Sequence, residues 1–497
     1  MLKKILYFSA VLLAQPAYSQ KPSTIELINA DVFEYRESDG RKLRMLLGNV
    51  SFKHEGALML CDSAYLYSET NTLDAFGNVH IKEGDSLNIY GDSLQYYGNS
   101  RMANIKGRVI LLQNNIKLTT GALSHDMAMN TASYYNRGKI VDGENDLTSK
   151  IGVFQVNKNE LTFRDSVVLI NPKYRMDADT LRYNTVTETA FFHGPTEIIS
   201  DENHISCSLG WYDTKNNICQ FTNKAKLFSK DQSVEGDSLF YDRNTGAGKA
   251  LNNITIFDSI QNIMITGDYA EYFEKEEAAM VTGNAMLTYI YEDDSLFLHA
   301  DTLRSGHDSA GEFRVFYAYN KVRFYRHDLQ GKCDSLVFTY YDSTMQMYVE
   351  PVLWAEENQM SADYIELKKN EDGIESISFI DNSFIVSQVD SASYNQTRGK
   401  MMKGYFKENM LSTIHVSGNG QSIYYPKEKD STFIGVNRVS CSDMMIYVEE
   451  NAIKKISFLQ QPDATLFPIG DLKPNELMLK GFVWLNEIRP MRKEDIF

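Results

Sequence analysis

A six-residue pattern recurs about every thirty residues through most of this chain of 497 residues. It consists of a small residue, Asp, Ser or Thr, an apolar residue, any residue and an aromatic residue, as in Gly91-Asp92-Ser93-Leu94-Gln95-Tyr96. Its Asp recurs at Asp31, Asp62, Asp92, Asp179, Asp237, Asp268, Asp301, Asp334 and Asp363. Weaker copies near Gly121, Lys150, Cys207, Lys400 and Ser442 bring the array to about fourteen units. A fixed period is typical of stacked units, which present an extended surface rather than a single catalytic pocket.

Between the Asp positions lies a second signature, Gly-Asn-Val or a relative, followed by alternating apolar residues. One copy is Gly77-Asn78-Val79-His80-Ile81, and another is Gly107-Arg108-Val109-Ile110-Leu111. Alternation with a period of two predicts half-buried β-strands. We expect the Gly-Asn pairs to mark the turns by which the chain enters these strands.

The apolar residues change parity at the repeat Asp. They occupy Leu296, Leu298 and Ala300 before Asp301, and Leu303 after it. A strand cannot change its buried face without a bulge or a corner, and an Asp side chain can hydrogen-bond the backbone groups left unpaired there. We therefore predict that the nine repeat Asp residues are structural corner residues rather than catalytic carboxylates. Each unit should then hold about two antiparallel strands of an all-β fold.

The first nineteen residues have the composition of a secretory signal peptide. Lys3 and Lys4 precede a short apolar run at 5–14, and Ala17-Tyr18-Ser19 supplies small residues for cleavage. We predict export with cleavage after Ser19, and a retained signal anchor is the alternative. Removing the two lysines takes the net charge from −16 to −18. Such acidity disfavours nucleic acid, whose binding needs a basic face.

The five cysteines do not form a complete disulfide framework, because their number is odd. Cys61, Cys333 and Cys441 occupy the small-residue position of the repeat, where a compact buried thiol is expected. Cys207 and Cys219 could approach one another on adjacent strands, and that pairing stays open. The sequence has no zinc-protease histidine pair, serine elbow or phosphate loop, so we expect no enzymatic activity, no cofactor and no metal site.

Spacing and composition divide the chain into four parts. Residues 1–19 are the signal peptide and residues 24–390 the clear repeat array. Residues 391–470 hold degenerate repeats, and residues 471–497 form a C-terminal tail outside the repeat.

The units resemble the OstA-like domain of the periplasmic lipopolysaccharide-transport bridge proteins. That family also alternates an Ala-Asp or Gly-Asp strand ending in Tyr with a Gly-Asn-Val strand, and the resemblance covers Ile28 to about Leu466. It implies an elongated, twisted antiparallel β-jellyroll built from about fourteen ~30-residue OstA-like repeats. It further implies an apolar groove for lipopolysaccharide acyl chains. Other jellyroll components of the transport machinery, or copies of this chain as a homo-oligomer, would stack edge to edge.

On this resemblance, the inward apolar residues are candidates for the lipid groove. They are Val79, Ile81, Leu94, Tyr96, Val109, Leu111, Leu181, Tyr183, Leu239 and Tyr241. A filled core without a groove fits the same residues. We predict a periplasmic bridge that moves lipopolysaccharide toward the outer membrane and contributes to outer-membrane assembly, with outer-membrane association left open. The alternative is an exported structural or adhesive β-solenoid without lipid transport.

Overall fold

The computed structural model describes residues 23–38, 41–201, 203–291, 294–370, 373–408, 410–428, 432–449 and 452–497. The expected signal peptide at 1–19 lies outside these residues. The described chain contains 36 β-strands and three short 3-10 helices, and the strands pair antiparallel, so the prediction of an antiparallel all-β fold is confirmed. None of its helices is long and apolar enough to cross a membrane. The chain divides into two compact units, Met1–Val186 and Thr187–Phe497.

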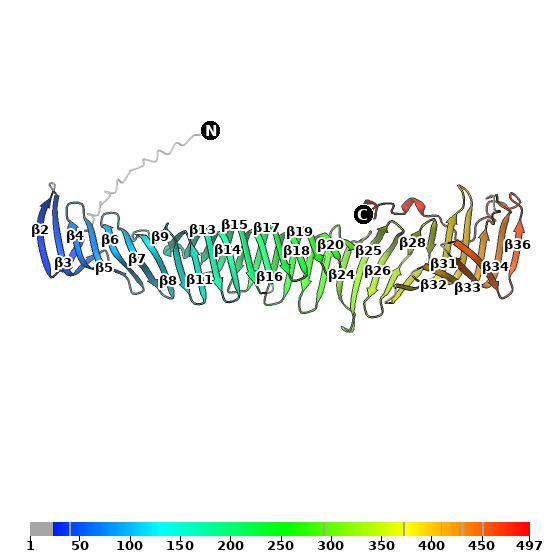
Figure 1. Ribbon diagram of the computed structural model, residues 1–497, viewed down its shortest axis with the longest axis horizontal. Coiled ribbons are helices and arrows are strands. Elements are labelled where there is room, and N and C mark those ends of the chain that lie inside the picture. The colour runs from blue at the N-terminus through cyan, green and yellow to red at the C-terminus, as the bar shows by residue number, and fades with distance from the viewer. Residues whose placement is uncertain are drawn as a thin grey trace, which may run out of the picture. The chain divides into compact units, whose positions relative to one another are not determined.

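The strands of unit 1 follow one another in chain order (Figure 1). They are β1 (Glu26–Asn29), β2 (Val32–Ser38), β3 (Arg41–His54), β4 (Ala57–Tyr67), β5 (Thr72–Glu83), β6 (Leu87–Tyr97) and β7 (Met102–Gln113). Then come β8 (Ile116–Asp126), β9 (Thr131–Tyr134), β10 (Gly138–Asp142), β11 (Asn145–Ser149), β12 (Ile151–Gln155), η1 (Val156–Lys158), β13 (Glu160–Asn171) and β14 (Tyr174–Asn184).

Unit 2 holds the remaining elements. They begin with β15 (Thr189–Ser200), β16 (Asn203–Asp213), β17 (Ile218–Ser229), β18 (Gln232–Asp242), β19 (Ala247–Asp258), β20 (Ile263–Phe273), β21 (Ala278–Thr282) and β22 (Met286–Ile290). Next are β23 (Ser295–His299), β24 (Thr302–His307), β25 (Arg314–Arg326), β26 (Leu329–Thr339), β27 (Thr344–Tyr348), β28 (Val352–Ala355), β29 (Asn358–Ser361) and β30 (Tyr364–Asn370). The last are β31 (Gly373–Gln388), β32 (Tyr394–Lys407), β33 (Met410–Tyr424), β34 (Val436–Glu449), β35 (Ala452–Leu459), β36 (Asp463–Phe467), η2 (Asn486–Ile488) and η3 (Lys493–Ile496).

The long strands shift register near their middle. Between β5 and β6, Phe76 pairs with Ser93 and Val79 pairs with Gly91, so two residues of β5 lie opposite the single Asp92. Those two residues, Gly77 and Asn78, both have the left-handed backbone, with φ of 75° and 45°. Gly77 is also required by space, since a Cβ there would lie 2.4 Å from Asp62 Oδ2. The expectation that Gly-Asn pairs mark entry turns is therefore wrong, because here they form mid-strand bulges.

The register shift changes which side chains are buried. In β6, Leu87, Ile89 and Gly91 are buried before Asp92, and Leu94 and Tyr96 are buried after it. The change of parity bends the strand so that both halves bury side chains on the same side. In β6 and the other strands that carry the repeat Asp, we call the half before the Asp layer A and the half after it layer B. Residues 79–83 of β5 pair with layer A, and residues 72–76 pair with layer B.

The two layers face one another across the core of unit 1. His54 belongs to layer A and Tyr96 to layer B, and the ladders do not pair them. Their side chains nevertheless form a buried hydrogen bond of 2.7 Å between His54 Nδ1 and the Tyr96 hydroxyl. Unit 1 is thus a sandwich made by folding each strand at its corner, as in a jellyroll.

The C-terminal segment 471–497, here named the strap, runs back along layer A of unit 2 from β34 toward β23 (Figure 1). Two buried glutamines bind its main chain. Gln396 of β32 donates to Leu477 O and accepts from Leu479 N, each at 2.8 Å. Gln359 of β29 does the same with Val483 O and Leu485 N, each at 2.7 Å.

Apolar side chains fill the space between the strap and the strands. Leu479 is 4% exposed and belongs to one cluster with Phe384, Val386, Ile423, Tyr425 and Val436. Phe384 and Val386 alternate along β31 with Ser383, which is on the inward face because its register position is that of Val79 in β5. The strap therefore covers the outward face of layer A, and this layer of unit 2 is buried on both sides where the strap crosses it.

Candidate functional site

The ten groove candidates differ in how far solvent reaches them. Eight are buried; Val79, Ile81, Leu94, Tyr96, Val109, Leu111 and Leu181 are at most 3% exposed, and Leu239 is 8% exposed. Tyr183 and Tyr241 are half-buried. The structure brings the first six together in the interior of unit 1, and Leu239 and Tyr241 occupy the same register positions of β18 in unit 2.

The second inward residue from the corner in layer A differs in exposure between β3–β8 of unit 1 and β15–β22 of unit 2. In β3–β8 these residues are buried, and we call them the closed inner row. Later in unit 1, Leu169 of β13 is half-buried at the same position. The closed inner row comprises Phe52, Met59, Ile81, Ile89, Leu111 and Leu118. In β15–β22 of unit 2 the same positions are only half-buried, and we call them the open inner row. Beyond β22 the row is buried again at Leu298, Phe324 and Leu353. The open inner row comprises Ile198, Ile205, Leu227, Val234, Ile256, Ile265 and Leu287. Solvent therefore reaches a continuous line of aliphatic side chains on the inward face of unit 2.

Polar contacts tie the layers together in unit 1. Besides the His54–Tyr96 bond, the buried His125 of layer B lies 2.9 Å from Glu83 Oε2 of layer A. The Tyr134 hydroxyl reaches Ser149 Oγ at 2.6 Å. Burial raises the pKa of Tyr96 to about 12, so its hydroxyl stays protonated at neutral pH. These contacts cross the space that an acyl chain would occupy.

The open inner row of unit 2 faces tyrosines of layer B. Tyr212 and Tyr241 are half-buried there, and Tyr272 is 46% exposed. Burial, followed by the hydrogen bond to Glu274, raises the pKa of Tyr241 to about 12. Gly248 of β19 stands at the register position that Leu73 fills in β5. The unit 2 interior thus contains less side-chain volume at this position.

The repeat Asp residues lie at the register shifts, where most accept a hydrogen bond or ion pair from the bulge of the next strand. The donor–acceptor pairs are Asn49–Asp31, Asn78–Asp62, Arg108–Asp92, Asn253–Asp237, Asn284–Asp268, Lys321–Asp301 and Asn382–Asp363. At Asp179 and Asp334 the following hydroxyl, Thr180 or Ser335, donates instead. The hydrogen bond from Arg108 lowers the pKa of Asp92.

We call these pairs corner latches, and sequence reasoning missed the donor of each. The signal was present as spacing, because the Asn or Arg follows its Asp by 16 residues in four of the pairs. One latch is reversed. Lys150 stands at the Asp position and bonds Asp165, a bulge residue of β13, at 2.6 Å.

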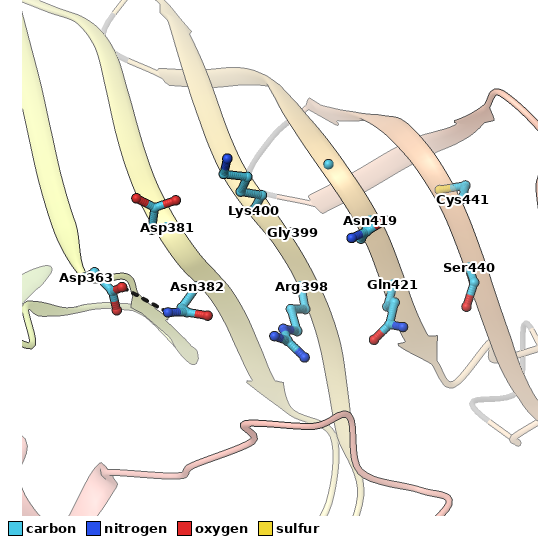
Figure 2. A pocket seen from close by; sticks show the side chains of 12 residues that line it. Asp363, Asp381, Asn382, Arg398, Gly399, Lys400, Asn419, Gln421, Ser440 and Cys441 are labelled. Atoms are coloured by element: carbon cyan, nitrogen blue, oxygen red, sulfur yellow. Dashed lines mark hydrogen bonds between the residues drawn. The ribbon is translucent and has the colours of Figure 1, made fainter.

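Lys400 also replaces the repeat Asp, but the bulge of the next strand, Gly418–Asn419, supplies no carboxylate. A surface pocket of about 640 Å³ opens at this corner. Figure 2 shows the Asp363–Asn382 latch at the neighbouring corner, with Arg398 and Lys400 on the strand beside it. The pocket is polar and lies at the corners, away from the inward apolar faces.

The cysteines are buried free thiols. Burial raises the pKa of Cys61, Cys207 and Cys219 to about 11 and that of Cys333 to about 12. Cys207 and Cys219 are unpaired, which answers the question left open by the sequence. Within the described ranges, no three His, Cys, Asp or Glu side chains are grouped to hold a metal.

The fold and the corner latches define a class, antiparallel β-jellyroll repeat proteins. Residues 22–179 match the family described as OstA-like protein. A comparison with curated proteins finds no match.

Proposed function

We propose that this chain is a periplasmic lipid carrier that moves lipopolysaccharide toward the outer membrane along the inward apolar face of unit 2. The observation that supports this most directly is the open inner row, seven aliphatic side chains of β15–β22 that are only half-buried on a face that is buried in β3–β8 of unit 1. An acyl chain lying there would gain about 0.8 kcal/mol for each buried methylene. The OstA-like match is consistent with the bridge proteins of lipopolysaccharide transport. No catalytic step is assigned to the chain.

The proposal also includes the structural role of the corner Asp residues and the boundaries of the repeat array. The corner Asp residues serve the fold rather than the lipid, since their carboxylates are engaged in latches. The boundary between 24–390 and 391–470 falls before the corners at which Lys400 and Ser442 replace the Asp.

Partner jellyrolls, or further copies of this chain, pair with the edge of unit 1. There β2 pairs on one side with β3, and it exposes Phe33 and Tyr35 by 52% and 55%. An edge strand with exposed aromatic side chains is suited to β-augmentation.

Site-specific photocrosslinking tests the carrier function. A photoreactive residue at Ile256 or Leu227, on the open inner row, should capture lipopolysaccharide in cells that export it. The matched controls are Thr255 and Lys226, which alternate with those residues on the same strands and face outward. Capture restricted to inward positions supports the carrier, and equal capture at all four positions contradicts it.

The closed interior of unit 1 favours a second candidate, an exported structural or adhesive β-solenoid without lipid transport. Its buried side chains and cross-layer bonds are those of an ordinary packed core. Depletion of the protein separates the two functions. The carrier predicts that lipopolysaccharide accumulates at the inner membrane, whereas the structural protein predicts normal lipopolysaccharide at the cell surface.

A further inference from the structure

The next inward position beyond the open inner row, toward the hairpin turns, forms the rim of the apolar face. Between β19 and β26 the side chains at this rim change from small and polar to aromatic and basic. Upstream, the layer A rim carries small polar side chains, Ser200, Asn203 and Ser229. Downstream it carries Tyr289 and Arg326, which follow Leu287 and Phe324 at inward positions. The opposite rim, in layer B, carries Tyr272, Arg314 and Tyr340. Two arginines and three tyrosines thus border the apolar face here, in a chain with a net charge of −16.

We call these rim side chains the rim cluster. Arg314 and Tyr340 are neighbours across a strand pair, where the Tyr340 N–H donates to Arg314 O at 3.2 Å. Burial raises the pKa of both Tyr272 and Tyr340, and the charge of Arg314 opposes the shift in each case. Arg314 also acts on Asp258, which lies on the opposite rim. The strand pairing thus places Arg314 beside Tyr340 on the layer B rim, and the charge of Arg314 acts on groups of both rims.

Aromatic packing extends the cluster on the layer A side. The rings of Tyr289 and Tyr291 are 4.5 Å apart, and the Arg326 guanidinium lies 5.9 Å from the centre of the Tyr291 ring. On the layer B side, Phe338 and Tyr340 pack edge to face at 5.0 Å. Tyr272 and Tyr340 are each 46% exposed, so a ligand can reach both rings.

The charged side chains near the rim differ in whether another side chain or a backbone group binds them. Arg326 is bound by Asp328, and the carboxylate of Asp258 accepts hydrogen bonds from the Ile260 and Gln261 N–H groups and from Gln232. Arg314, in contrast, has no carboxylate within 4.0 Å in the part of the chain that the structure describes. An exposed guanidinium without an ion pair at the edge of an apolar face is available to an anionic ligand.

We propose that Arg314, together with Tyr272, Tyr289 and Tyr340, binds the phosphate-bearing head group of a lipid whose acyl chains lie on Ile256, Ile265 and Leu287. This assignment rests on the proposed carrier function and adds a head-group site at one place along the apolar face. The guanidinium binds phosphate oxygens through paired N–H donors. The tyrosine rings supply flat surfaces with a hydroxyl at the edge.

Two lipids that differ only by the phosphate test this site. Wild-type protein should bind phosphatidic acid about tenfold more tightly than diacylglycerol with the same acyl chains, as one charge-assisted contact allows. Arg314→Ala should remove this preference while leaving diacylglycerol affinity unchanged. Arg314→Lys should keep part of it, because lysine retains the charge without the paired donors. Arg304→Ala is the control, since Arg304 alternates with inward Leu303 and Ser305 and is exposed on the other face of β24.

The outcomes separate this inference from the function on which it rests. If wild-type protein binds neither lipid, the carrier function fails. If it binds both equally, or if Arg314→Ala keeps the preference, the head-group site alone is overturned. Inorganic phosphate at the lipid concentration should leave the preference intact. Loss of the preference under that competition would mean that the site takes a free anion, which also overturns the proposal. Equal thermal unfolding midpoints for the Arg314 and Arg304 variants exclude misfolding as the cause.

Discussion

Strands β3–β8 of unit 1 and β15–β22 of unit 2 are built from the same bent strand pairs, yet the first interior is closed and the second is open to solvent. Ile81 and Ile256 occupy equivalent positions, three residues after the left-handed pair, and only Ile81 is fully buried. Unit 1 fills the space between its layers with large side chains and joins them through His54–Tyr96. Unit 2 has Gly248 where unit 1 has Leu73. The repeat therefore sets the path of the backbone, and a few inward side chains decide whether a groove remains.

The inner rows should show the largest difference between the units. Ile81→Ala is expected to lower the free energy of unfolding of unit 1 by about 3 kcal/mol, because it leaves a cavity among fully buried side chains. Ile256→Ala should cost unit 2 about 1 kcal/mol, since solvent already reaches that side chain. Hydrogen exchange resolves each unit, and tryptophan fluorescence follows unit 2, which contains all three tryptophans. Equal costs would contradict an open interior.

The strap should give the next largest effect, confined to unit 2. Gln396→Ala leaves Leu477 O and Leu479 N without partners at a buried site, which should cost about 2 kcal/mol. Proteolysis within 471–497 should accelerate, and unit 1 should be unaffected. Gln95→Ala, at an exposed position of β6, is the control. A protease-resistant strap in the Gln396 variant would show that its apolar contacts are sufficient.

A matched pair of tyrosines tests the cross-layer bonds. Tyr96 and Tyr241 end the same repeat motif, but the Tyr96 hydroxyl bonds buried His54, and the Tyr241 hydroxyl bonds exposed Glu274. Tyr96→Phe should destabilise unit 1 by about 1–2 kcal/mol, because the His54 nitrogen loses its partner in a buried site. Tyr241→Phe should cost unit 2 less than about 0.5 kcal/mol. Urea midpoints of the two variants measure the difference, and a reversed order would refute it.

The smallest effect is expected at the reversed latch of unit 1. The hydrogen bond from Lys150 lowers the pKa of Asp165, so the latch stabilises the fold above the unfolded pKa of about 4 and loses that contribution as the pH falls below it. Lys150→Met should remove this part of the acid dependence, and the exchanged pair Lys150→Asp with Asp165→Lys should restore it. High salt should weaken the effect, because both side chains are exposed. An unchanged acid profile in Lys150→Met would rule the latch out.

The antiparallel fold was predictable because its signals are local. The alternation of apolar and polar residues predicts the strands, and the parity change at Asp301 predicts a bend. Neither prediction requires knowledge of distant contacts. The role of Asn78 was not predictable from the dipeptide, since Gly-Asn satisfies an entry turn and a mid-strand bulge equally well. The strap was missed because Gln359 and Gln396 stand at outward positions where the alternation expects polar residues. The exposure of Ile256 depends on the separation of the layers, which no local pattern encodes.

The corner latches have a consequence for how a repetitive chain finds its order. Strands with nearly identical patterns can mispair with the wrong neighbour, and such errors are common in repeat proteins. The latches differ in chemistry, with Asn on Asp62, Arg on Asp92 and the inverted Lys150–Asp165 pair. A strand that pairs out of turn would place Lys150 beside Arg108, or Asp165 beside Asp92, and like charges would meet. The different side chains at the corners thus disfavour pairing between the wrong hairpins.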